Sequence, residues 1–127
     1  MKITVVKEFS FEAAHYLPGY DGPCERLHGH SYRLLIGVSG KIDPISGMVM
    51  DFSKLKNEVN FHIIPLLDHS CLNDIQSHSF PREMPTAEKM VVWIWNQLHV
   101  ILESPSKLNS IRMYETASSY AEWRLEQ

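Results

Sequence analysis

Hydrophobic and polar residues alternate along two long stretches in the N-terminal third of the chain. In the first stretch the apolar residues take odd positions: Ile3, Val5, Phe9, Phe11 and Ala13. In the second they take even positions: Tyr32, Leu34, Ile36 and Val38. A period of two is typical of a β-strand with one buried face. Pro18-Gly19 and Asp21-Gly22-Pro23 indicate turns between the stretches, so we predict two strands paired as an antiparallel hairpin with a long loop.

Two segments with helical spacing follow. Asp51 is expected to cap the first helix, which should end before Pro65. Thr86 is expected to cap the second, where the carboxylate of Glu88 would complement the helix dipole. Pro105 should close this second segment. Its apolar stripe consists of Met90, Val91, Ile94, Leu98 and Ile101.

Two further strand-like runs, 110–116 and 120–125, complete the order strand, strand, helix, helix, strand, strand. This order predicts an α+β fold with an antiparallel sheet and the helices on one face, in a single domain over residues 1–127. Such a sheet has two free edges, and Val6, Trp123 and Leu125 are expected on its other face. Edges of neighbouring copies could pair into a closed barrel, so we expect a homo-oligomer.

Composition and charge narrow the range of partners. The net charge is −3 and the lysines and arginines are scattered, which is not the pattern of a nucleic-acid binder. No apolar run approaches the roughly 20 residues that span a membrane, and the N-terminus reads directly into a strand. The two cysteines, Cys24 and Cys71, do not form a dense disulfide framework. We therefore expect a cytoplasmic protein with neither nucleic-acid nor membrane partners.

Three histidines fall where the two predicted strands meet. His15 ends the apolar face of the first strand, and His28 and His30 begin that of the second. Antiparallel pairing would bring them together as three metal ligands, leaving one coordination position free, as in catalytic rather than structural zinc sites. Imidazole suits zinc, but also iron, nickel and copper. Ordinary hydrogen-bonded histidines are the preferred interpretation for His62, His78 and His99.

Glu115 lies at the end of an apolar strand face, in phase with Ile111 and Met113. A buried carboxylate costs several kcal/mol unless it has a partner. The partner could be Arg112 or a nearby lysine, or the side chain could simply be exposed at the end of the strand. The partner could also be a ligand with two parallel N–H donors, such as a pterin or guanine ring.

Candidates for acid–base chemistry lie in two loops. Cys24 precedes a proposed metal ligand by four residues, and a nearby cation would lower the pKa of its thiol. Asp68 and His69 could form an imidazole oriented by a carboxylate, as proton transfer requires. We assign no functional role to Cys71.

Taken in order, these motifs carry a specific resemblance that spans nearly the whole chain. They resemble those of the family of 6-pyruvoyltetrahydropterin and 6-carboxytetrahydropterin synthases. The resemblance implies the tunnelling fold (T-fold), in which trimers form a β-barrel and two trimers stack into a hexamer with sites at subunit interfaces. The motifs are Phe11-Glu-Ala-Ala-His15, Cys24-x-x-x-His28-Gly-His30-x-Tyr32, Gly47-Met-Val-x-Asp51-Phe52, Leu67-Asp68-His69-x-x-Leu72-Asn73, Pro85-Thr86-x-Glu88 and Glu115-Thr116.

Carried over residue by residue, the resemblance implies a role for each candidate. Cys24 becomes the proton acceptor, with Asp68 and His69 as its relay partners from a neighbouring subunit. Glu115 becomes the pterin anchor, and Thr86 adds a pterin contact, although a helix-capping role explains Thr86 equally well. The implied zinc (Zn2+) ligands are His15, His28 and His30.

The implied substrate is 7,8-dihydroneopterin triphosphate. Only three residues separate Cys24 from His28, which resembles the bacterial branch that makes 6-carboxy-5,6,7,8-tetrahydropterin for queuosine and other 7-deazapurines and releases acetaldehyde and triphosphate. The alternatives are the pyruvoyl branch, which keeps the side chain intact, a metal-dependent pterin- or purine-binding module without catalysis, and a zinc hydrolase. Arg26, Lys54 and Arg82 are candidates for holding the triphosphate by charge alone.

Overall fold

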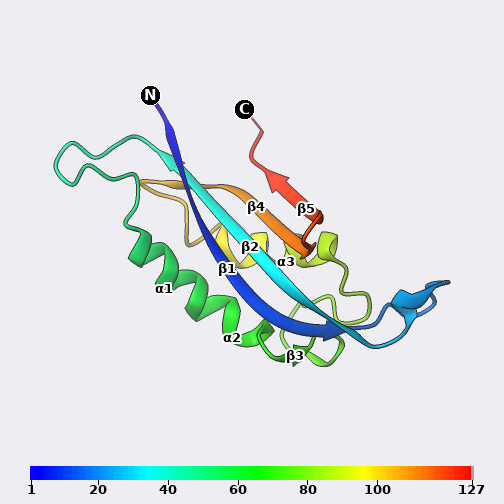
Figure 1. Ribbon diagram of the computed structural model, residues 1–127. Helices are drawn as coiled ribbons and strands as arrows, with labels where there is room; N and C mark the ends of the chain where they lie inside the picture. Colours follow the sequence, from blue (N-terminus) through cyan, green and yellow to red (C-terminus); the bar gives the residue numbers. More distant parts are fainter. Residues whose placement is uncertain (127) are drawn as a thin grey trace.

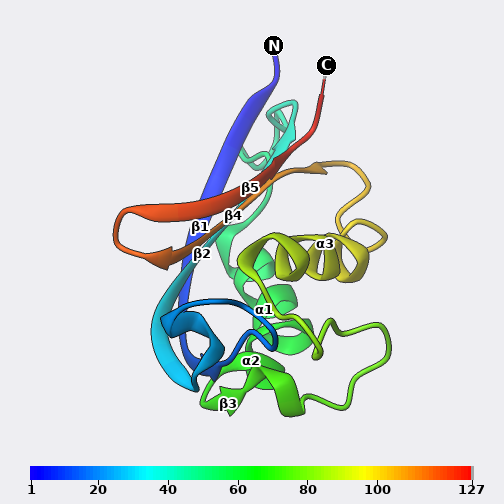
Figure 2. The ribbon, with the colours of Figure 1, turned by 90° about the vertical axis from the view of Figure 1, so that its right-hand side faces the viewer.

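The computed structural model describes residues 1–126 and consists of one five-stranded sheet with its helices packed against one face (Figures 1 and 2). The strand order is β3-β1-β2-β4-β5. The strands are β1 (Ile3–His15), β2 (His28–Gly40), β3 (Ser70–Cys71), β4 (Lys107–Thr116) and β5 (Ser119–Arg124). The helices are α1 (Phe52–His62), α2 (Ile64–Leu67) and α3 (Ala87–Leu98), with 3-10 turns η1 (Pro23–Glu25) and η2 (Leu72–Asp74).

The predicted N-terminal hairpin is the centre of the sheet. β1 and β2 pair antiparallel along their whole length, from Ile3 opposite Gly40 to His15 opposite His28. The side chains predicted to face inward form the core, because period-two alternation sends them all to the helix side. The fully buried members from β2 are Tyr32, Leu34, Ile36 and Val38.

Both predicted helix caps are present. The Asp51 carboxylate accepts a hydrogen bond from the Ser53 backbone N–H at 2.7 Å, and the Thr86 hydroxyl accepts one from the Lys89 N–H at 3.2 Å. The predicted end of the second helix is wrong by three residues, because α3 ends at Leu98 and the chain turns there. Pro65 does not stop helical structure altogether, since it lies in the first turn of α2, where a proline needs no N–H partner.

The sheet is mixed, so the prediction of an all-antiparallel sheet is wrong. β3 has only two residues and runs parallel to β1, with Ala13 opposite Ser70. A strand this short leaves no periodicity in the sequence, so hydrophobic patterning could not reveal it. The other four strands are antiparallel, as predicted.

The helix-free face of the sheet is polar. Arg33 pairs with Glu8 at 2.9 Å, and Arg112 pairs with Glu122 at 2.7 Å. Val6 is exposed there, as predicted, but the placement of Trp123 was wrong, because it packs on the helix side with its ring centroid 6.0 Å from that of Trp95. Within residues 1–126, no helix is both long and apolar enough to cross a membrane.

Replacing Ile36 with alanine tests the core. Ile36 is fully buried on the central strand, so Ile36→Ala should lower the free energy of unfolding by about 2–5 kcal/mol. Val92→Ala, on the exposed side of α3, is the control and should change it by less than about 0.5 kcal/mol. Urea denaturation at one fixed protein concentration measures both, and equal losses would contradict this description of the core.

Candidate metal centre

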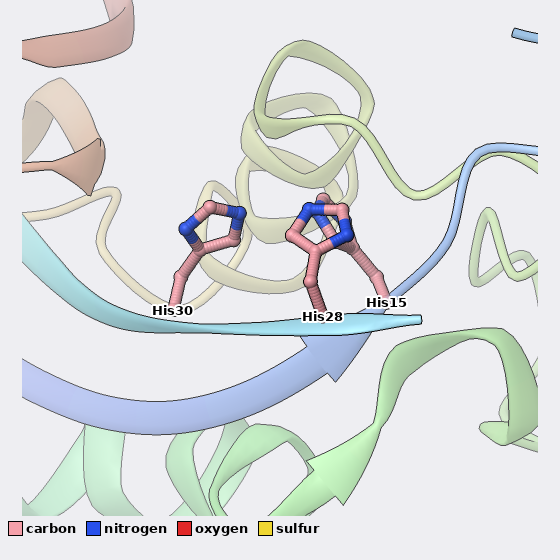
Figure 3. Close-up of side chains that lie close together, drawn as sticks. All are labelled: His15, His28 and His30. Carbon is pink, nitrogen blue, oxygen red and sulfur yellow. The ribbon is translucent and has the colours of Figure 1, made fainter. Parts of the chain in front are cut away.

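The end of β1 and the start of β2 bring three imidazoles together on the helix side of the sheet (Figure 3). His15 lies directly opposite His28 in the ladder, and His30 lies opposite Ala13. One ring nitrogen from each histidine lies within 4.8 Å of the others. Within residues 1–126, these three side chains are the group whose ligand atoms could hold a metal ion, as the sequence predicted.

Two of the rings are fixed by backbone carbonyl groups. His15 Nδ1 lies 2.9 Å from the Pro85 oxygen, and His28 Nδ1 lies 2.6 Å from the Arg26 oxygen. A carbonyl oxygen can only accept, so each Nδ1 must carry the hydrogen and each Nε2 of the neutral ring has a free lone pair. These two Nε2 atoms lie 3.1 Å apart, an arrangement that a shared proton or cation relieves. Carbonyl groups behind the ring are the usual outer partners of metal-binding histidines.

His30 supplies the third nitrogen. Its Nε2 is buried and has no hydrogen-bond partner. Burial is the largest influence on this ring and lowers its pKa, the neighbouring imidazoles lower it further, and Glu115 opposes them. The lowered pKa favours the neutral ring, whose buried Nε2 faces the other two imidazoles. A buried nitrogen without a partner beside two oriented imidazoles fits a bound metal ion.

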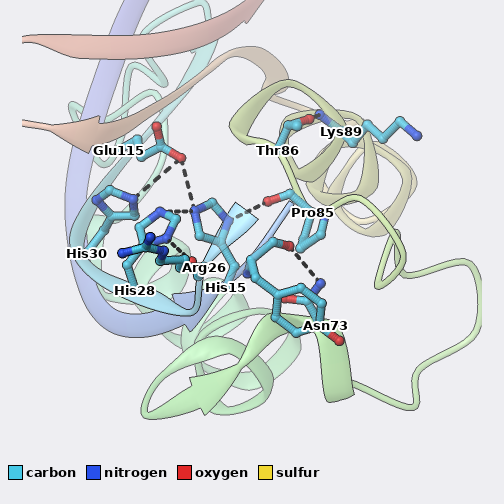
Figure 4. Close-up of polar contacts among 10 residues, drawn as sticks. His15, Arg26, His28, His30, Asn73, Pro85, Thr86, Lys89 and Glu115 are labelled. Carbon is cyan, nitrogen blue, oxygen red and sulfur yellow. Dashed lines mark hydrogen bonds and ion pairs between the residues drawn. The ribbon is translucent and has the colours of Figure 1, made fainter. Parts of the chain in front are cut away.

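Glu115 projects from the end of β4 into the same cluster (Figure 4). Its Oε1 lies 3.5 Å from His15 Nε2 and 3.8 Å from His30 Nε2. The alternative ion pair with Arg112 is wrong, because Arg112 lies on the opposite face and pairs with Glu122. From this position the carboxylate can reach either a metal ion or a ligand held beside it.

A hollow of about 260 Å³ opens beside Glu115. It lies between the first turn of α3, with Ala87 and Glu88, and the start of β5. Thr86 stands at the N-terminus of α3, but its hydroxyl caps the helix, so the structure accounts for Thr86 without a ligand. The hollow offers a ligand access to the carboxylate of Glu115.

The supports of the cluster, among them the Arg26 carbonyl already described, were not identified from the sequence. The Pro85 carbonyl orients His15 through a backbone atom, which no residue type reveals. The Asn73 side chain accepts a hydrogen bond from the Tyr16 N–H at 3.0 Å and donates one to the Tyr16 oxygen at 2.9 Å. It thereby ties η2 to the residue that follows His15. The sequence indicated that Asn73 and Pro85 matter only by placing them in the motifs that carry the family resemblance.

Asp68 and His69 form the predicted pair, with His69 Nδ1 3.0 Å from Asp68 Oδ1. The Glu12 N–H donates to the same oxygen at 2.9 Å, and this hydrogen bond is the largest influence lowering the pKa of Asp68, with His69 adding to it. His69 has a positive φ of 59°, and its side chain is 80% exposed. Asp68 is therefore an anion that orients an accessible imidazole.

The structure does not bring this pair to the three histidines of its own chain. His69 lines a shallow pocket of about 390 Å³ whose other lining residues include Glu12, Ser31, Ala13 and His30. The side chains of Glu12 and Ser31 face the opposite side of the sheet from the metal-ligand candidates, because they alternate with Ala13 and His30 along their strands. The Asp68–His69 pair thus lies at the edge of the sheet beside Glu12, outside the group of ligand atoms formed by residues 1–126.

The remaining candidates occupy other positions. Cys24 lies in η1 and is partly buried, and its sulfur does not belong to the group of ligand atoms formed by residues 1–126. Arg26 contributes its backbone oxygen to His28. Lys54 lines a cleft next to the 41–51 loop, and Arg82 lines a separate pocket with Lys89. Neither of these two pockets includes a residue of the cluster.

Comparison with known proteins gives a consistent result. Residues 4–126 match the family model described as 6-pyruvoyl tetrahydropterin synthase. A Synechocystis protein named 6-carboxy-5,6,7,8-tetrahydropterin synthase is 41% identical, over 94% of this chain and 91% of its own. A Haemophilus influenzae protein of the same name is 34% identical, over 94% and 97%. The structure of Caenorhabditis elegans 6-pyruvoyl tetrahydropterin synthase superposes with a TM-score of 0.85 at 27% identity, covering 99% of this chain and 97% of that one.

Removing one imidazole tests the metal centre. His30→Ala should weaken zinc binding by more than roughly 100-fold, because one of three ligands is lost. His62→Ala is the matched control, since His62 lies on α1 and pairs with Glu58 at 3.4 Å. Isothermal titration with zinc chloride and elemental analysis of the purified proteins measure the effect. Equal zinc affinity in His30→Ala and the parent would show that the cluster is not the metal site.

Proposed function

The chain belongs to the 6-pyruvoyl tetrahydropterin synthase family, and we propose that it is a 6-carboxy-5,6,7,8-tetrahydropterin synthase, a lyase acting on 7,8-dihydroneopterin triphosphate. The observation that carries this proposal is the extent of the similarity: relatives of that name align with more than nine-tenths of the chain. The three-histidine cluster beside Glu115 provides a site with the chemistry that such a reaction needs.

Zinc is the metal that we assign to the cluster, since three neutral imidazoles suit it and leave a position for substrate. Bound there, zinc would act as a Lewis acid toward the side-chain oxygens of the substrate. The residues that would hold it are His15, His28 and His30.

Glu115 is the proposed anchor for the pterin ring. A pterin presents parallel N–H donors along one edge, and a carboxylate accepts two such hydrogen bonds side by side. The hollow between Glu115 and the start of α3 supports this assignment, because it gives a flat ring a route to the carboxylate. Thr86, at the same helix end, is proposed as a secondary pterin contact through atoms that its capping bond leaves free.

Cys24 is the proposed base that removes a proton from the substrate side chain, and His69 the acid that returns one. The contact with Asp68 supports the role of His69, because the carboxylate fixes the orientation of the imidazole ring. After loss of triphosphate, one water molecule adds to the side chain, and cleavage of its carbon–carbon bond releases acetaldehyde and leaves a carboxylate on the pterin. Reduction of the dihydropterin ring to the tetrahydropterin balances the oxidation of the carbon that becomes the carboxylate.

A complete site on this proposal requires more than one chain. The position of His69 outside its own cluster, bordering Glu12 and Ser31, supports a role for it at the cluster of a neighbouring copy. The polar helix-free face and the free edges of the sheet suit the tunnelling fold, with trimers forming a barrel and two trimers forming a hexamer. A cytoplasmic role in queuosine and 7-deazapurine synthesis completes the proposal.

The second candidate is 6-pyruvoyl tetrahydropterin synthase, which eliminates triphosphate and keeps the side chain. The structural likeness to the Caenorhabditis elegans enzyme favours it, since both share the whole fold. A metal-dependent pterin-binding module is less suited, because such a module has no use for a paired carboxylate and imidazole.

Product analysis distinguishes these functions. We expect the zinc-loaded protein to release acetaldehyde and triphosphate in equal amounts from dihydroneopterin triphosphate, measured by coupled alcohol dehydrogenase and by chromatography.

Cys24→Ala should lower the rate by at least about 100-fold, because the base is lost. Cys71→Ala, which removes the other free thiol, should keep the parent rate. Triphosphate release without acetaldehyde would identify the pyruvoyl branch, and full activity of Cys24→Ala would remove the thiol from the mechanism.

Mixed oligomers test whether sites are shared. Cys24→Ala and His69→Ala should each be inactive alone. When the two are co-expressed in equal amounts, random assortment should give about one site in four both groups from undamaged chains, restoring roughly a quarter of the parent activity. Co-expression of Cys24→Ala with a Cys24→Ala/His69→Ala chain is the control and should restore none. An inactive mixture of the two single variants would mean that one chain supplies both groups.

A further inference from the structure

Tyr32 is fully buried on β2, yet its hydroxyl has no hydrogen-bond partner. Its ring stacks on Phe11, with centroids 4.8 Å apart and planes 9° from parallel. This aromatic pair accounts for the ring of Tyr32. It does not account for the hydroxyl.

A buried hydroxyl without a partner lowers the stability of the fold relative to an apolar group of the same shape. Phenylalanine would keep the stack on Phe11 and avoid this cost. Any function of the hydroxyl oxygen must involve the groups that surround it.

Those groups belong to the metal-ligand cluster. The ring centroid of Tyr32 lies 5.5 Å from that of His30 and 6.3 Å from that of His15. In the β2–β4 ladder the pair at this end is Arg33 and Tyr114, and Tyr32 and Glu115 are the next residues beyond it on their strands. Tyr32 thus lies close to the histidines that the Glu115 carboxylate contacts.

The hydroxyl is available as a donor throughout the working pH range. A phenol keeps its proton at neutral pH, because its ordinary pKa is about 10. A phenol that stays protonated next to a carboxylate has one natural acceptor, the carboxylate oxygen.

We propose that Tyr32 is a positioning residue for Glu115: its hydroxyl donates a hydrogen bond to the Glu115 carboxylate in the ligand-bound state and turns it from the histidine nitrogens toward the pterin edge. Glu115 Oε1 lies 3.5 Å from His15 Nε2 and 3.8 Å from His30 Nε2. A metal ion held by those nitrogens would compete with the carboxylate for them, and Glu115 would then need another hydrogen-bond donor. This inference rests on the proposed function, because it assumes that Glu115 receives the N–H groups of a pterin.

Tyr32→Phe isolates the hydroxyl, since the ring and its stack are retained. We expect the affinity for neopterin, measured by its fluorescence, to fall about tenfold, the loss of one hydrogen bond to a charged group. KM for dihydroneopterin triphosphate should rise by a similar factor, while kcat stays within about twofold and the zinc content is unchanged. The melting temperature should stay constant or rise, because an unpartnered buried hydroxyl is removed.

Tyr114→Phe is the matched control. It removes a phenolic hydroxyl from the residue next to Glu115, but that hydroxyl contacts Arg112 on the other face at 3.3 Å. Neopterin affinity should not change in this variant. A purely structural role for Tyr32 would change the melting temperature and leave the affinity and KM untouched, which would overturn the proposal.

A double-mutant cycle assigns the effect to Glu115. If the hydroxyl acts through this carboxylate, Tyr32→Phe should add nothing to the loss caused by Glu115→Gln. Additive losses would overturn the proposal. In the parent protein with ¹³Cζ-labelled tyrosine, neopterin should also shift the Tyr32 resonance, and no shift would count against the inference even if a variant folds poorly. A parent that neither binds neopterin nor consumes dihydroneopterin triphosphate would instead contradict the proposed function.

Discussion

The register between β1 and β2 is the constraint on which the rest of the structure depends. With His15 opposite His28, every odd residue of β1 and every even residue of β2 faces the helices. A slip of one residue would turn the whole apolar set, and the imidazoles with it, to the opposite side. The register that buries the apolar core therefore also sets the side of the sheet that the three imidazoles face, because both sets of residues follow the same alternation.

Some polar groups at the cluster find no hydrogen-bond partner in the surrounding core. Three buried side-chain polar atoms have no hydrogen-bond partner among residues 1–126, and two of them, His30 Nε2 and the Tyr32 hydroxyl, lie at the cluster. The third, Trp93 Nε1, lies beside Phe80. Buried polar atoms without hydrogen-bond partners therefore concentrate at the expected functional site, where a ligand can supply the missing partners.

The two faces of the sheet divide the proposed chemistry. The metal-ligand candidates and Glu115 lie on the helix side, whereas Asp68 and His69 lie at the edge of the sheet next to Glu12, whose side chain faces the other side. We therefore assign the two sets to different sites, so that each chain would hold parts of two sites. On our proposal, assembly is then a requirement of catalysis as well as a means of covering free edges.

Hydrophobic alternation in the sequence determined the hairpin, the shared face of the three histidines and the two capped helices, because strand and helix periods and capping residues act over a few neighbours. The two-residue β3, the Pro85 and Arg26 carbonyls behind the imidazoles and the contact of Glu115 with the cluster required the tertiary structure. These features join segments that are distant in sequence or use backbone atoms that every residue has. The position of His69 at the edge of the sheet was likewise decided by the fold, since it follows from a turn with positive φ and a pairing with β1.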